Sequence, residues 1–193
     1  MKKVALVLII GLSLLSSCTK EQVVVLSDQE KSDLLFLREE EKLARDVYLF
    51  SLDKYSQFIF SNISDSEQSH MSSVLTLLNK YGIPDPVANS AVGVFSNGEL
   101  QTLYDQLTAK SGTSLTMALE VGATIEDLDI NDIDEFISHT SKADLLSTYS
   151  RLTCGSRNHL RSFVGQLGTY SPVYISQEEY ETIISSSHEQ CGN

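Results

Sequence analysis

The segment Ser64-Asp-Ser-Glu-Gln-Ser-His-Met71 contains a glutamate and a histidine, Glu67 and His70, that lie three positions apart. On an α-helix, residues at this spacing share one face, so the carboxylate and the imidazole can bind one metal ion. Apolar residues recur on that face at intervals of three and four, as in core-facing helices: Ile63, Met71, Val74, Leu77, Leu78 and Tyr81. A polar pair inside such a stripe needs partners, because burial without them costs free energy.

Glu67 also fits a purely structural role. Ser64 and Glu67 match the capping box, in which the fourth residue bonds back to the amide of the capping residue. In this alternative Glu67 binds no metal. In both roles the helix is expected to begin at about Asp65 and to run to about Tyr81. The pattern of polar residues on the other helices is needed to distinguish the two roles.

Three further segments have the apolar spacing of long helices, at residues 27–53, 113–139 and 141–167. Each has acidic or imidazole side chains inside its apolar stripe: Glu41 in the first, Glu126 and Asp129 in the second, and His159 in the third. Tyr48 follows Glu41 by two turns on the same face. Other acids fall outside the stripes and are expected on the solvated surface: Glu39, Glu40, Glu120 and Asp127.

The connection between the second and third long helices is unusually long. Gly82-Ile-Pro-Asp-Pro86 ends the second helix, because proline cannot continue it. Residues 82–97 are expected to form a loop, and Asn97 to cap a short helix over 98–110. A crossover of this length is typical of a bundle whose second and third helices run parallel. We therefore expect one bundle domain over residues 27–167, followed by a tail, 168–193, in which Ser176 caps a last short helix.

The N-terminus has the features of an export signal. Lys2 and Lys3 precede an apolar run that ends in Leu15-Ser-Ser-Cys18, so residues 1–17 are expected to be removed. Leu-Ser-Ser-Cys resembles the bacterial lipobox, which implies lipid attachment at Cys18, a tether over 18–26, and anchoring to a bacterial membrane on its periplasmic or outer face. The alternative is an ordinary signal peptide with a chance cysteine.

Charge and cysteine content exclude several classes of function. Without Lys2 and Lys3 the chain has 12 basic and 26 acidic residues, a net charge of −14, which disfavours binding to nucleic acid. No Cys-x-x-Cys pair is present, so a rubredoxin-type iron centre and a four-thiolate zinc site are excluded. Cys154 and Cys191 remain, and an exported compartment permits a disulfide between them, but the spacing leaves open whether they pair.

Polar ligand-type residues thus interrupt the apolar stripe of all four long helices. Several buried carboxylates brought together repel one another and are driven towards protonation, and divalent cations remove both costs. The pattern predicts a metal site on the bundle axis, formed by Glu41, Glu67, His70, Glu126 and His159.

Four segments carry a resemblance to a known class of proteins: Arg38-Glu-Glu-Glu-Lys-Leu-Ala-Arg45, Ser66-Glu-Gln-Ser-His-Met71, Gly122-Ala-Thr-Ile-Glu-Asp-Leu-Asp-Ile130 and Gly155-Ser-Arg-Asn-His-Leu-Arg161. They resemble the ferritin-like di-iron carboxylate superfamily, and most closely an uncharacterised bacterial and archaeal ferritin-like family. The resemblance covers about residues 28–167. It implies an all-α fold, a ferritin-like four-helix bundle whose long crossover carries a short extra helix, and it implies two iron ions, with manganese or zinc as alternatives.

The chain departs from that pattern in the last long helix. Where the pattern has a glutamate three positions before His159, this chain has Ser156. Asp129, one turn after Glu126, would restore the number of carboxylates from the neighbouring helix, although its side chain is a methylene shorter.

Two functions of different classes follow. The first is an envelope-anchored oxidase- or peroxidase-like di-iron protein that reacts with dioxygen or hydrogen peroxide, with Tyr48 beside the site. Such a protein needs an external electron donor, and an oligomer is compatible with it. The second is a non-catalytic helical lipoprotein that binds a partner and whose interior polar groups form a hydrogen-bonded network. Storage or scavenging of metal without redox turnover is a third alternative.

Overall fold

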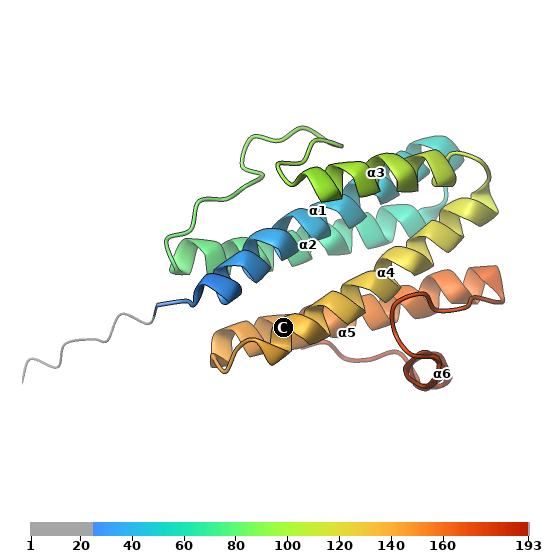
Figure 1. Cartoon of the computed structure of the whole chain (residues 1–193). Helices are drawn as coiled ribbons and strands as arrows, with labels where there is room; N and C mark the ends of the chain where they lie inside the picture. Colours follow the sequence, from blue (N-terminus) through green and yellow to red (C-terminus); the bar gives the residue numbers. More distant parts are fainter. Residues whose placement is uncertain (1–24, 193) are drawn as a thin grey trace, which may run out of the picture.

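The structure, a computed structural model, describes residues 25–192. Over this range the chain forms six α-helices and no β-strand (Figure 1): Asp28–Tyr55 (α1), Phe58–Lys80 (α2), Gly98–Ser111 (α3), Leu115–Ser138 (α4), Ala143–Leu167 (α5) and Gln177–Ser185 (α6). The all-α prediction is therefore confirmed. The predicted signal peptide and Cys18 lie outside the described residues. Within those residues no helix is both long enough and apolar enough to cross a membrane.

The four long helices pack as two pairs, α1 with α2 and α4 with α5 (Figure 1). The pairs meet through contacts of α1 with α4 and of α2 with α5, while α3 lies against α1 and α4. Two apolar clusters fill the interior. One contains Leu37, Val74 and Ile133, and the other contains Ala44, Ile63 and Ile130. On α1, Glu41 lies between Leu37 and Ala44, so a polar layer lies between the clusters.

α2 begins at Phe58, earlier than predicted, which excludes the capping role of Glu67. Ser64 lies inside the helix, and its hydroxyl donates to the carbonyl of Ser61. The helix extends backwards because Phe60 and Ile63 continue the buried face. The pattern Ser141-x-x-Asp144 fits a capping box but does not cap α5: Lys142 precedes that helix without a side-chain cap, and Asp144 accepts hydrogen bonds from Lys80 and Tyr81 at the end of α2.

Several charged residues in the middle of α1 that lie outside the apolar stripe are buried, contrary to the prediction for Glu39 and Glu40. The crossover folds over this side of α1 and its backbone polar groups need partners there. Three α1 side chains bind it: the Glu39 carboxylate accepts from the amides of Ser96 and Asn97, Arg38 pairs with Asp85 at 2.9 Å, and Lys42 donates to the carbonyl of Ala91. Helical periodicity could not reveal this second buried face because it faces a loop.

Asp127 on α4 was expected on the surface but is completely buried. The segment after α5 folds back over it and directs four donors at its carboxylate: the Tyr170 hydroxyl and the amides of Val173, Tyr174 and Ile175. Asp127 therefore anchors the tail to α4. The short helix α6 then follows from its cap Ser176, as predicted.

The end of the tail is fastened to α5. Cys154 and Cys191 form a disulfide. Glu189, two residues earlier, pairs with Arg157 at 2.5 Å and with Arg161 at 2.7 Å. These two arginines lie one turn apart on α5, so the ion pairs and the disulfide hold the same stretch of tail against one helix.

Replacing Glu189 by glutamine is expected to weaken the protein at neutral pH but not at low pH. Hydrogen bonding to Arg157 and Arg161 lowers the pKa of Glu189 from 4.5 to about 2. A carboxyl whose pKa is lower in the folded chain stabilises it fully above the unfolded value, and the effect is lost as the pH falls through the folded value. Because the pair is partly exposed, we expect a loss of about 1 kcal/mol at pH 7. Denaturant unfolding should show that difference disappearing between pH 4.5 and 2. Glu178→Gln, at an exposed position of α6, is the control, and a gap that does not change with pH would contradict the assignment.

Candidate metal centre

Glu67 lies between two imidazoles at the centre of the polar layer. Its Oε2 atom lies 2.8 Å from Nδ1 of His70, and its Oε1 atom lies 2.8 Å from Nδ1 of His159. Glu41 approaches the first imidazole at 3.2 Å and Glu126 approaches the second at 3.3 Å. Two groups of three potential ligands result, Glu41–Glu67–His70 and Glu67–Glu126–His159, and they share Glu67.

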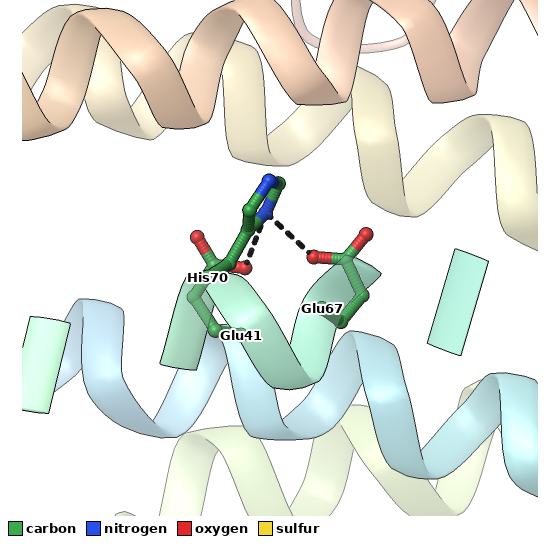
Figure 2. A group of neighbouring side chains, drawn as sticks. All are labelled: Glu41, Glu67 and His70. Atoms are coloured by element: carbon green, nitrogen blue, oxygen red, sulfur yellow. Dashed lines mark hydrogen bonds and ion pairs between the residues drawn. The ribbon is translucent and has the colours of Figure 1, made fainter. Parts of the chain in front are cut away.

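Each of the four long helices supplies part of this arrangement. Figure 2 shows the first group, in which Glu41 from α1 and Glu67 from α2 converge on the His70 ring. His70 extends towards α5, where Gly155 leaves space for it: a Cβ atom at Gly155 would lie 2.5 Å from His70 Nε2. The His70 and His159 rings stack with their centroids 5.5 Å apart. The sequence prediction named all five of these ligand residues, and the structure brings them together.

The distances fit metal ligation. Ligand atoms about 2.1 Å from an ion, at right angles to one another, are separated by roughly 3.0 Å. The four carboxylate–imidazole distances of 2.8, 2.8, 3.2 and 3.3 Å lie close to this value. Moreover, Oε1 of Glu41 and Oε1 of Glu67 are buried without a correctly directed hydrogen-bond donor among the described residues. Such atoms are costly unless a cation or a proton binds them.

The charges of these groups depend strongly on one another. Burial raises the pKa of Glu41 well above its usual value, and Asp129 adds to this effect. Burial would also raise the pKa of Glu67, but His70 and His159 outweigh it and lower that pKa. Although burial opposes it, the carboxylates of Glu126 and Glu67 raise the pKa of His159 to about 10. With all three carboxyl groups ionised, the centre would hold more negative charge than its two imidazoles neutralise, and a bound cation would remove this cost.

Tyr48 positions one of the carboxylates. Its hydroxyl donates to Oε1 of Glu126 at 2.5 Å, and the whole side chain is buried. The oxygen of Glu126 that faces His159 is Oε2, so the tyrosine binds the opposite side of the carboxylate. Burial and the adjacent Glu126 carboxylate raise the pKa of Tyr48 well above its usual value, and the phenol keeps its proton. Tyr48 therefore acts on the centre through Glu126.

Replacing Tyr48 by phenylalanine is expected to weaken metal binding in one of the two groups only. The substitution keeps the ring in its contact with Phe163 and removes the hydroxyl that orients Glu126. Loss of such a supporting hydrogen bond lowers metal affinity by about 10- to 100-fold. Titration of the metal-free protein with zinc should give one unchanged and one weakened site, whereas equal weakening of both would contradict the assignment.

Asp129 lies next to the centre but in neither group. The hydroxyl of Ser156 donates to its Oδ2 atom, so the two residues that depart from the ferritin-like pattern contact each other. Burial and the charge of Glu126 raise the pKa of Asp129 to about 7. The serine therefore holds a carboxylate from α4 beside the position that a glutamate on α5 would occupy.

Comparison with known proteins places the chain in a family. Residues 30–187 match the family described as "Uncharacterized protein domain (DUF2202)". The chain belongs to this family. It is 51% identical over 183 residues to "Uncharacterized protein MJ0754" of Methanocaldococcus jannaschii, an alignment that covers 93% of this chain and 97% of the relative. The crystal structure of the hypothetical protein MJ0754 superposes with a TM-score of 0.84 at 53% identity, covering 85% of this chain and 96% of that one.

The DUF2202 domain holds a further buried carboxylate that the sequence analysis placed on the surface. Glu40 is 3% exposed, and neither of its carboxylate oxygens accepts a hydrogen bond from the described residues. Burial raises the pKa of Glu40 well above its usual value, and Asp129 and Asp132 act in the same direction. The one sequence feature that indicates this burial is the run Glu39-Glu-Glu41. Consecutive helical positions point in different directions, so three acids in a row cannot all lie on the same face. Glu40 extends the acidic interior of the domain beyond the two ligand groups.

Proposed function

We propose that the protein binds two transition-metal ions in the two groups that share Glu67. The observation that carries this proposal is the position of Glu67, whose two oxygens each lie 2.8 Å from the Nδ1 atom of a different imidazole. One ion would be held by Glu41 and His70, the other by Glu126 and His159, with Glu67 between them. Carboxylate and imidazole ligands suit iron, and they also accept manganese or zinc.

Within this proposal the protein is an oxidoreductase of the ferritin-like di-iron class. The bound metal pair would supply electrons for the reduction of dioxygen or hydrogen peroxide. The chain's own residues hold the ligands in place: Tyr48 orients Glu126, and Ser156 orients Asp129. The apolar clusters on either side of the polar layer exclude water. The chemistry requires an external electron donor, and an oligomer would be compatible with it.

We also propose that the protein is lipid-anchored through Cys18 on the periplasmic or outer face of a bacterial membrane. The support for this is the sequence Leu15-Ser-Ser-Cys18 after an apolar run. Mass spectrometry of the protein purified from membranes tests it. A diacylglyceryl group on Cys18, absent from Cys18→Ser, is the expected result, and an unmodified N-terminus elsewhere would contradict it.

The competing function is a non-catalytic domain whose interior polar groups bond to one another. One observation favours it: the separations of 2.8 to 3.3 Å between imidazoles and carboxylates also suit ion pairs with protonated histidines. Such a network would stabilise the fold without any ion. A chelator would then leave the free energy of unfolding unchanged.

Metal analysis separates the two functions. The protein is purified after aerobic growth and after anaerobic growth in iron-replete medium, and its metal content per chain and its visible spectrum are measured. Two transition-metal ions per chain and a near-ultraviolet carboxylate-to-iron absorption band in the oxidised protein are expected. Absence of bound transition metal after both preparations, and after addition of iron(II) to the purified protein, would contradict the proposal.

A further inference from the structure

A groove of about 770 Å³ lies between α2 and α5, on the far side of the two imidazoles from the carboxylates. His70 and His159 form part of its lining, and the end of the tail, with His188 and Cys191, contributes another part. Pockets of 300 to about 1,000 Å³ are typical of sites for small organic molecules. The groove thus connects solvent with the outer edges of the imidazoles.

Small side chains on the two facing helices open this groove. The lining residues of α2 recur at the spacing of one helix face, and three of them are serines, Ser66, Ser69 and Ser73. The facing residues of α5 include Gly155 and Ser162. Because the two helices run in opposite directions, the hydroxyls of one line the groove opposite the small residues of the other. Each side chain at these positions offers a hydrogen bond or leaves space.

None of the described residues that line the groove is acidic, although the chain carries a net charge of −12. Its one guanidinium, Arg151, is exposed and forms no ion pair within the described part of the chain. Among the described residues, Arg151 has one hydrogen-bond partner, the hydroxyl of Thr148, at 3.5 Å. A guanidinium that forms no ion pair with the described residues is well suited to a carboxylate or a phosphate, which it can bind through two hydrogen bonds.

One imidazole also presents an unused donor. The Nδ1 atom of His70 faces Glu41 and Glu67, so a metal ion bound at Nδ1 leaves the ring hydrogen on Nε2, on the side of the groove. No described residue accepts from His70 Nε2, whereas His159 Nε2 lies 2.9 Å from the hydroxyl of Ser66. Histidines that bind a metal usually donate their second N–H to a partner, and His70 has none on the protein side.

We propose that this groove binds a small polar organic anion. Its carboxylate or phosphate group pairs with Arg151, an acceptor oxygen receives the His70 Nε2–H, and the serines bind its remaining polar groups. The proposal rests on the proposed function in that such a ligand would contact a metal-bound imidazole and so alter the centre. The groove and Arg151 are present whether or not metal is bound, and the Nε2–H donor is available when the metal occupies Nδ1.

Calorimetry with defined probes tests the proposal. Citrate and glycerol 3-phosphate are titrated into zinc-loaded protein and into metal-free protein, with neutral glycerol as the comparison and the zinc content counted in each sample. We expect saturable one-site binding of at least one anion and none of glycerol. Arg151→Gln should weaken that binding at least tenfold, and Lys110→Gln, an equal change of charge on α3, should alter it less than twofold. No saturable anion binding, or equal binding by Arg151→Gln, would overturn the proposal.

A second pair of variants tests the location. Ser73→Phe fills the groove and should abolish anion binding, while Ser72→Phe places the same ring on the adjacent exposed position of α2 and should not. In zinc-loaded protein labelled with ¹⁵N, the anion should shift the His70 Nε2 resonance and leave His139 unchanged. A shift confined to other residues would overturn the proposal. Because zinc is counted separately, the two proposals can be contradicted separately. Absence of anion binding to a protein that holds two zinc ions would contradict the anion site alone. Absence of bound zinc would contradict the metal centre.

Discussion

Replacing Glu67 by alanine is expected to abolish binding of both metal ions, a larger effect than that of any other single substitution in the centre. Glu67 belongs to both ligand groups, whereas Glu41 and Glu126 each belong to one. Each ion, present at about 1,000 times its dissociation constant, stabilises a folded protein by about 4 kcal/mol, so two ions contribute about 8 kcal/mol. For a chain of this length the corresponding rise in the melting temperature is roughly 20 °C. Calorimetric melting of wild type and Glu67→Ala, each with and without zinc, should show that rise in the wild type alone.

Two further variants make the experiment specific. Glu41→Ala and Glu126→Ala should each retain about one ion and roughly half of the thermal shift. Glu99→Ala, at an exposed position of α3, should behave as wild type. Two ions bound by Glu67→Ala with wild-type affinity would contradict the bridging role.

Replacing Asp127 by alanine is expected to destabilise the folded chain by about 3 kcal/mol or more, with or without metal. The substitution leaves four buried or partly buried donors without their acceptor, three of them backbone amides of the tail. Buried donors that lose their partner cost about 1 to 3 kcal/mol each, and the tail can relax to recover part of this. Chemical denaturation measures the loss, and hydrogen exchange should show reduced protection at the amides of Val173 to Ile175.

The position of Asp127 allows a matched control. Asp65→Ala removes an exposed carboxylate from α2 and should change the stability by less than about 0.5 kcal/mol. Asp127→Asn keeps the volume and one acceptor oxygen, so it should fall between wild type and alanine. A loss for Asp127→Ala as small as that for Asp65→Ala would show that the tail is held elsewhere.

Apolar periodicity was sufficient to predict the long helices and the residues that form the ligand groups. The stripe of α2 contains Glu67 and His70, and tertiary packing buried both as predicted. Periodicity reports the side of a helix that faces another helix. It could not indicate that a loop would cover Glu39 and Lys42 on α1, or that the tail would cover Asp127 on α4, because those segments have no periodicity of their own.

The role of Glu67 could not be decided locally. Glu67 is the last residue of the capping-box pattern Ser64-x-x-Glu67 and also the first residue of the ligand pair Glu67-x-x-His70. Only the position of the helix start distinguishes the two roles. The structure starts α2 at Phe58, two turns earlier, because buried residues precede Ser64.

The bonds between α1 and the crossover should hold the protein together after the crossover is cleaved. Arg38, Glu39 and Lys42 hold the crossover at three points along its length, through Asp85, the amides of Ser96 and Asn97, and the carbonyl of Ala91. A broad-specificity protease that cleaves between Val87 and Ala91 would therefore produce two fragments with attachments on both sides of the cut. Because α1 and α2 lie on one fragment and α4 and α5 on the other, the nicked protein should migrate as a single species on a native gel and separate only under denaturing conditions.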